Sequence, residues 1–189
     1  MRKTCMPRKL AITVLGIVAA AALLVPGAPA LAATHPATHV PASAAPPLTV
    51  KLTHAGRAPN AVDPECILFY MNAQGQPGGL AHISSFLLHH HKIRAVKINA
   101  EIQCRRVSMN LVLQVTLWKT GLLFPHKQAG PTTATAAKGN QLKNQKTFRQ
   151  CLNRTSSTFY GTAFASVIFQ GVQFTGSLQS GKATLACGT

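Results

Sequence analysis

Two neighbouring stretches alternate strictly between apolar and polar side chains, and this alternation most constrains the fold. In "KINAEIQC", residues 97–104, every second residue is apolar and Cys104 falls among the apolar ones. In "VSMNLVLQVTL", residues 107–117, all the odd-numbered positions are apolar, so Val107 and Met109 are expected on the same face as Leu117. A period of two is typical of a β-strand with one buried face. We expect two half-buried strands with a tight corner between them.

Four further stretches also predict strands: residues 66–72, 157–171, 172–181 and 182–187. Gly161 and Gly176 interrupt two of them and are interpreted as β-bulges. Residues 131–147 are rich in Thr, Ala and Asn and predict a long polar loop or a ragged edge strand. The sequence therefore predicts an all-β, antiparallel, immunoglobulin-like β-sandwich, with a small barrel as the alternative.

The N-terminus predicts export. Four basic residues precede an apolar run over residues 10–25, and small residues follow at 30–32, which is typical of a cleaved signal peptide. The next segment, residues 33–47, contains four prolines and no charge, a composition that favours a disordered leader. We therefore expect a signal peptide over 1–32, a leader over 33–47 and one domain over 48–189. No membrane span is expected after cleavage.

Four cysteines lie beyond the signal peptide. Their spacings all exceed thirty residues, which disfavours a zinc site and favours two disulfides in an exported chain. Cys104 and Cys151 are expected to join strands that face each other across the sandwich. Cys66 and Cys187 lie on the first and last strands, which often lie close together. The predicted pairs are Cys104–Cys151 and Cys66–Cys187.

The second half of the chain carries a family resemblance. The stretch "VTLWKTG" at 115–121, the stretch "TFYGTAFASVIF" at 158–169 after the third of these cysteines, and the ending "ATLAC" resemble the small secreted β-sandwich proteins of actinobacteria. The likeness covers about residues 95–189. It implies a β-sandwich fold and secretion. That family is largely without known function, so the resemblance implies no functional residue.

Acidic side chains are too few for most hydrolytic chemistry. Beyond residue 32 the only ones are Asp63, Glu65 and Glu101, whereas a glycosidase needs two facing carboxylates. The chain has neither a G-x-S-x-G motif nor a lysine-bearing phosphate-binding loop. With all four cysteines in disulfides, no thiol is left as a nucleophile. We expect a protein that is not an enzyme and that needs no cofactor.

The histidine run "LLHHHKIRAV", residues 87–96, is the other unusual feature. In a strand, His89 and His91 would project to one side and could bind zinc, copper or nickel weakly. A closed site would need further ligands, and none lies at a spacing that demands proximity. Lys92 and Arg94 would also repel a dication. We interpret the run as the solvated end of a strand, without a metal site.

Basic residues dominate the charge. Fifteen of the 19 basic residues and all three acidic residues lie beyond residue 32, which gives that part a formal charge of +12 with neutral histidines. Most of the cations fall in two clusters, within residues 92–106 and 138–154. The residues predicted to bind polyanions are Lys92, Arg94, Lys97, Arg105, Arg106, Lys143, Lys146, Arg149 and Arg154.

Candidate partners of this surface are teichoic acid, anionic lipid surfaces, extracellular DNA and acidic polysaccharide. Few aromatic residues accompany the basic runs, so specific nucleic-acid binding is not expected. A basic surface that only confers solubility is the alternative.

Two functions follow. The first is a secreted, non-enzymatic β-sandwich, extracellular or associated with the cell wall, that adheres electrostatically to anionic cell-envelope polymers. The second is a secreted protease inhibitor that presents Arg105 and Arg106 to a trypsin-like pocket, although a tight corner after Cys104 is expected to hide both side chains.

The signal peptide gives the first prediction. Cleavage after Ala32 should leave Ala33 as the N-terminus, because Ala30 and Ala32 are the small residues that signal peptidase reads. Mass spectrometry of protein from the culture medium measures this N-terminus. Recovery of the intact chain in the membrane fraction would contradict the prediction.

Overall fold

The computed structural model describes residues 49–54, 56 and 62–189. The predicted signal peptide and leader lie outside these residues. Within the described part, nine antiparallel strands form one sheet around a core, and there is one short helix. The elements are β1 (Thr49–Lys51), β2 (Thr53–His54), β3 (Cys66–Tyr70), β4 (His82–Ile83), α1 (Ser85–His91), β5 (Ala95–Lys119), β6 (His126–Gln150), β7 (Asn153–Phe169), β8 (Val172–Gln179) and β9 (Ala183–Gly188).

This arrangement confirms the predicted all-β, antiparallel class. The polar stretch 131–147 lies inside β6, which pairs only with β5 and is therefore an edge strand. None of the helices in the described residues is long and apolar enough to span a membrane.

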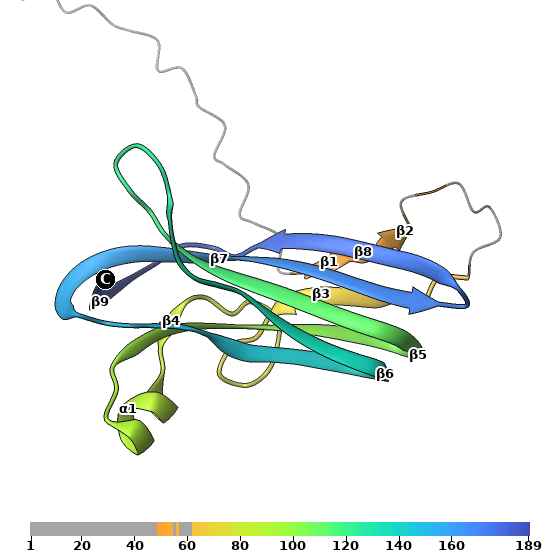
Figure 1. Ribbon diagram of the computed structural model, residues 1–189, viewed down its shortest axis with the longest axis horizontal. Coiled ribbons are helices and arrows are strands. Elements are labelled where there is room, and N and C mark those ends of the chain that lie inside the picture. Colours follow the sequence, from red (N-terminus) through yellow and green to blue (C-terminus); the bar gives the residue numbers. More distant parts are fainter. Residues whose placement is uncertain (1–48, 55, 57–61) are drawn as a thin grey trace, which may run out of the picture. The chain divides into compact units, whose positions relative to one another are not determined.

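Two long strands, β5 and β6, run through both layers of the sandwich. The first half of β5 pairs with β3 and β4, and its second half pairs with β7, while β6 accompanies it along most of its length. Figure 1 shows both strands turning back at one end of the molecule, so that β3 lies in one layer and β7 and β8 lie in the other. Strands that switch layers through a bend are a known way to build the corner of a sandwich.

The bend changes which residues of β5 face the core. Even-numbered residues from Ile98 to Cys104 are buried before it, and odd-numbered residues from Leu111 to Leu117 are buried after it. Asn110, with a φ of 48°, lies in the left-handed region between these two runs. The expectation that Val107 and Met109 face the core is therefore wrong, since both are exposed at the corner.

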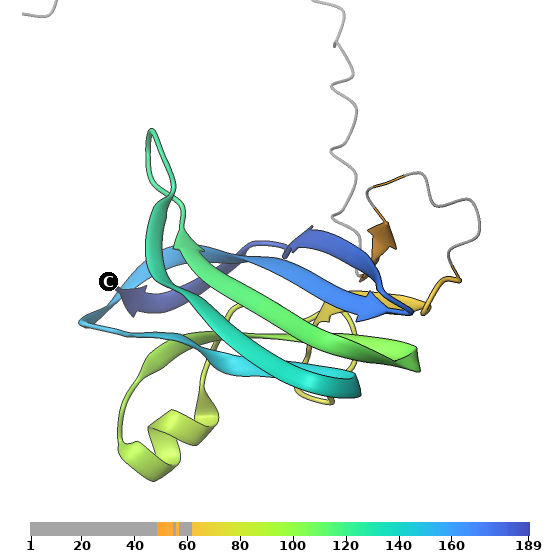
Figure 2. The same ribbon diagram turned by 45° about the vertical axis from the view of Figure 1, so that its right-hand side comes forward.

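The segment that contains β1 and β2 connects the two layers at the opposite edge. β1 pairs with β3 in one layer, and β2 pairs with β8 in the other. Leu52 lies between these two short strands, is fully buried, and donates its backbone N–H to the carbonyl of Cys66 at 2.9 Å. One extended segment thus closes the sheet on this side and gives the sandwich a barrel-like edge (Figure 2).

Buried polar groups join the layers along the β6 side. The amide of Asn144 donates to the carbonyls of Thr132 at 2.8 Å and Leu113 at 3.1 Å. The hydroxyl of Thr147 contacts that of Thr132 and donates to the carbonyl of Val115. Asn144 and Thr147 are almost completely buried, so these bonds satisfy groups that would otherwise destabilise the fold.

The disulfides connect Cys66 to Cys104 and Cys151 to Cys187, so the predicted pairing is wrong. Cys66 and Cys104 are direct cross-strand partners in one layer, with their Cα atoms 3.9 Å apart. Cys187 lies on β9, which pairs with β7 rather than with the first strand. Each bridge closes a loop of 38 or 36 residues, for which chain entropy gives a stabilisation of about 4 kcal/mol.

Gly161 marks a close contact between the layers. The expectation that Gly161 and Gly176 form bulges is wrong, because both lie in regular register with their partners. A Cβ on Gly161 would lie 2.4 Å from Cδ1 of Ile98 and 3.1 Å from the Tyr70 ring. The Tyr70 hydroxyl donates to the carbonyl of Leu178, and burial raises the pKa of this tyrosine well above its usual range.

This contact gives the second prediction. Gly161→Ala should lower the free energy of unfolding by about 1–3 kcal/mol, because the new methyl group overpacks the core. Urea denaturation measures the change. Gly139→Ala is the matched control, since the nearest atom to its added Cβ is 3.6 Å away. Equal stability of the two variants would contradict the packing argument.

Candidate functional site

The three acidic side chains of the domain all have basic partners. Asp63 lies 2.6 Å from Lys51, and Glu65 lies 3.1 Å from Arg105. The hydrogen bond and charge of Lys51 hold the pKa of Asp63 below its usual value, and those of Asp63 raise the pKa of Lys51. Apart from Lys51, Arg105 and Lys143, which pairs with Glu101, no basic side chain of the described residues has an Asp or Glu partner.

Glu101 is the third acid and lies under the surface of the first layer. Its carboxylate accepts a hydrogen bond from the Gln141 amide, and its other oxygen lies 3.7 Å from the ammonium of Lys143. Only 3% of its side chain is exposed. This burial and pairing explain Glu101 as a structural ion pair, and they leave no carboxylate of the described residues without a cationic partner.

The two predicted basic clusters are not compact patches. Lys97 and Arg105 lie eight positions apart on one strand, which corresponds to about 26 Å of extended chain. Lys143 and Arg149 lie along β6, which continues from the corner to the far end of the molecule. Sequence proximity along a strand therefore spreads these charges instead of gathering them.

Several of the predicted polyanion-binding residues also have structural contacts. Lys92 ends α1 in the left-handed conformation, and Arg94 donates to the carbonyl of Ala186 at 3.1 Å. Lys97 is half-buried on β5, and desolvation lowers its pKa. Arg106 lies over the Phe169 ring at 5.9 Å. The members that remain exposed with no described side-chain contact are Lys146, Arg149 and Arg154.

One hollow does bring cations together. It has a volume of about 550 Å³ and lies where the base of the β5–β6 hairpin meets the end of β6. Its lining residues, which we call the basic cleft, are Lys119, His126, Lys127, Gln128, Arg149 and Thr189. No Asp or Glu lines it.

Strand pairing explains why these residues line one hollow. Lys119 lies directly opposite His126 across the hairpin, and Lys127 lies opposite Trp118. Arg149 comes from the end of β6 that belongs to the other layer. Lys119 also donates to the Thr189 carbonyl at 3.1 Å, which fixes its ammonium beside the cleft. The arrangement suits an anion that several cations can reach together.

Sequence reasoning missed this grouping. Lys119 and Lys127 were outside both predicted clusters, although Arg149 was inside one. The available signal was their position on either side of the turn at 120–125, because a hairpin brings residues that flank its turn into contact.

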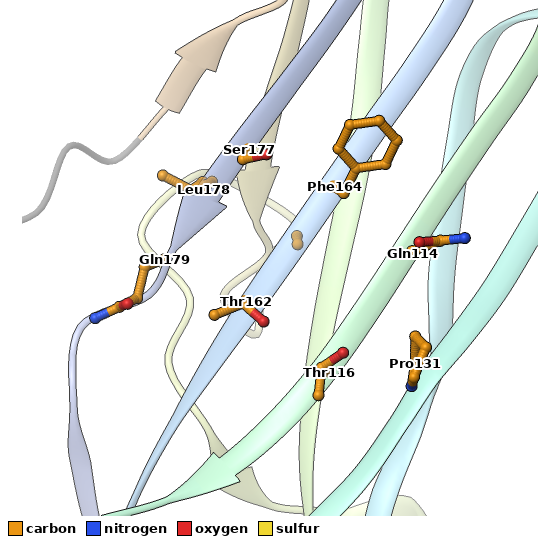
Figure 3. Close-up of a pocket in the computed structure, with 9 residues that line it drawn as sticks. Gln114, Thr116, Pro131, Thr162, Phe164, Ser177, Leu178 and Gln179 are labelled. Carbon is orange, nitrogen blue, oxygen red and sulfur yellow. The ribbon is translucent and has the colours of Figure 1, made fainter. Parts of the chain in front are cut away.

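A second hollow lies on the outer face of β5, β6, β7 and β8. Its lining residues carry no charge. Figure 3 shows its side chains, which are amides, hydroxyls, a proline, an aromatic ring and small or branched aliphatic groups. Its volume is about 410 Å³, and its lining residues, which we call the neutral face, are Gln114, Thr116, Pro131, Thr162, Ala163, Phe164, Ser177, Leu178 and Gln179. Amides and hydroxyls in such an array can donate and accept hydrogen bonds but supply neither an acid nor a base for catalysis.

A third hollow, of about 630 Å³, lies under the loop that follows β3. It is lined mainly by residues of that loop, together with His82, Asn99 and Lys143. Lys143 is already paired with Glu101, so the hollow offers little free charge.

The histidine run lies in α1, so its interpretation as a strand end is wrong. Ser84 caps the helix by accepting from the N–H of Leu87 at 3.3 Å. In a helix His89 and His91 point to different sides, because two residues turn the chain by about 200°. His91 instead packs with Phe86. Among the described residues no three His, Cys, Asp or Glu side chains group as metal ligands.

No family model, curated protein or solved structure matches this chain.

Proposed function

We propose that the chain is a secreted, non-enzymatic β-sandwich that adheres to anionic polymers of the cell envelope. The carrying observation is the basic cleft, which Lys119, Lys127 and Arg149 line together and which has no Asp or Glu in its lining. The two disulfides support maturation in an oxidising compartment, where such polymers are accessible.

A repeating polyanion fits this cleft better than a small anion does. Exposed cations each contribute little to binding, so useful affinity requires several contacts along one chain. Basic residues at the corner, such as Arg106, lie midway along β5 and offer further contacts to a long polymer.

The neutral face extends the same path. Lys127 and Trp118 are cross-strand partners, and Thr116 follows on the same face of β5. A polymer whose phosphates or carboxylates alternate with sugar or polyol units could place a charge at Lys127 and its hydroxyl groups over Gln114 and Thr162. This pattern favours wall polymers of the teichoic type over nucleic acid, which needs stacking platforms.

Salt dependence tests this proposal. Retention on immobilised wall polymer or heparin should fall steeply between roughly 50 mM and 500 mM salt, because the Debye length shortens from above 10 Å to about 4–5 Å. Lys127→Gln should elute at lower salt than Lys138→Gln, which removes the same charge from the same strand away from the cleft. Salt-independent retention would refute electrostatic adhesion, and equal elution of the variants would refute the cleft.

The alternative function, protease inhibition, has one favourable observation. Arg105 follows the Cys66–Cys104 disulfide, and 77% of its side chain is exposed, so the expectation that the corner hides it is wrong. Against inhibition, its guanidinium pairs with Glu65, and its backbone N–H already donates to the carbonyl of Glu65. A protease could not use this segment without breaking those bonds.

Trypsin inhibition separates the two functions. We expect no inhibition when the protein is equimolar with trypsin at nanomolar concentration, because the main chain around Arg105 is occupied within the sheet. Residual trypsin activity on a small chromogenic substrate measures this. Inhibition that Arg105→Ala abolishes would instead establish the inhibitor function.

A further inference from the structure

The turn between β5 and β6 exposes three consecutive large apolar side chains. The relative exposure is 106% for Leu122, 87% for Leu123 and 74% for Phe124. Among the described residues only Leu152, at 76%, is a large apolar residue of similar exposure. Single exposed apolar residues are ordinary on protein surfaces, whereas a contiguous group at this exposure marks an interaction site. We call residues 122–124 the apolar tip.

The tip is held by its neighbours. Gly121 lets the chain turn back closely, since a Cβ there would lie 2.3 Å from the Phe124 carbonyl. The hairpin below it is anchored by pairing of Lys119 with His126 and by a 2.9 Å bond from the Thr120 N–H to the Thr158 carbonyl. Figures 1 and 2 both show this turn rising away from the two layers.

Cations lie on both sides of the hairpin base. The basic cleft contributes Lys119, Lys127 and Arg149. Lys182 lines a separate hollow with Leu123 and Phe124 of the tip. No Asp or Glu lines either hollow. The tip is thus an apolar end surrounded by positive charge.

Aromatic rings complete the base of the hairpin. Trp118 and Tyr160 stack nearly parallel, with ring centroids 6.4 Å apart, and the indole N–H donates to the hydroxyl of Thr162. Trp and Tyr are enriched at the boundary between hydrocarbon and water in membranes, where their rings are apolar and their polar atoms stay hydrated. The order along the hairpin is therefore apolar tip, then cations and aromatic rings.

We propose that the apolar tip inserts into the outer region of a lipid bilayer that carries anionic lipids. The side chains of Leu122, Leu123 and Phe124 enter the acyl boundary, while the surrounding lysines and Arg149 contact lipid phosphates. A projecting tip can enter a fluid bilayer without a preformed cavity. Apolar insertion with basic residues at headgroup level is the arrangement by which peripheral proteins bind anionic membranes. This inference is independent of polymer adhesion, which needs the cations alone.

Vesicle sedimentation of protein recovered from the culture medium tests the insertion. The vesicles contain either phosphatidylcholine alone or phosphatidylcholine with phosphatidylglycerol. Wild-type protein should bind the anionic vesicles more strongly. The triple variant Leu122→Ser, Leu123→Ser, Phe124→Ser should bind them at least about tenfold more weakly, because each lost apolar side chain removes favourable transfer from water. Leu152→Ser is the matched control and should bind like the wild type.

Trp118 reports insertion directly because it is the only tryptophan of the chain. Its emission should shift to the blue on anionic vesicles and should be quenched by lipids brominated near the headgroup. In the triple variant both changes should disappear, while retention on wall polymer stays as in the wild type. A cooperative urea transition at the wild-type midpoint shows that the triple variant is folded.

Three outcomes would overturn the inference. Wild-type protein that does not bind anionic vesicles has no membrane-inserting tip. Equal binding of the wild type and the triple variant would mean that charge alone attracts the protein to lipid. The third outcome is a wild-type protein that self-associates but does not bind vesicles, with a triple variant that no longer self-associates. In that case the tip would contact a second copy of the protein and not a membrane.

Discussion

The bend in β5 and β6 is the constraint on which the rest of the structure depends. The two strands are 25 residues long each and enter both layers, so a single hairpin supplies a large share of the sheet. Their register breaks between Gln103 and Ser108, where five residues of β5 pass two of β6. The extra length on one strand forces the pair to turn, and the left-handed Asn110 restores pairing with the opposite side chains inward.

The bend also determines which residues lie at each end of the sandwich. At the corner, the first half of β5 meets β3, and the Cys66–Cys104 bridge lies across that pair. At the other end, the second half of β5 continues into the exposed turn, beside which Arg149 returns from the opposite layer. The cleft exists because the start and the end of β6 reach the same end of the sandwich.

The alternation of side chains was sufficient to predict β3, β5, β7, β8 and β9, because burial of one face acts on each strand locally. It did not predict the full length of β6, whose residues alternate mostly between exposed and half-buried positions. It was not sufficient for the connections between strands. Cys104 was correctly placed on an inner face, but whether its partner lies beside it or across the core depends on strand order, which no local pattern contains. The helix at Ser85–His91 was missed for a related reason: it buries no side chain, so it leaves no periodic signal. Only the capping Ser84 could have indicated it.

The sequence predicted that the candidate site would be basic, but it did not predict where in the fold the site lies. The composition shows an excess of cations. Many of the cations along β6, however, have an explanation other than binding a polyanion. Lysines on the unpaired edge of a sheet, such as Lys138 and Lys146, prevent edge-to-edge aggregation, and dispersed charges suffice for that purpose.

The cations that line the basic cleft are different, because protecting a sheet edge from aggregation does not require several cations in one place. Neighbouring like charges repel weakly in water and more strongly where water is partly excluded. An anion among Lys119, Lys127 and Arg149 would relieve this repulsion. The same relief is available from a wall polymer or from lipid phosphates, so the cleft alone selects for negative charge. The apolar tip is the feature that distinguishes between these partners, since Leu122 and Leu123 gain nothing from a hydrated polymer and leave water only when a bilayer or another apolar surface receives them.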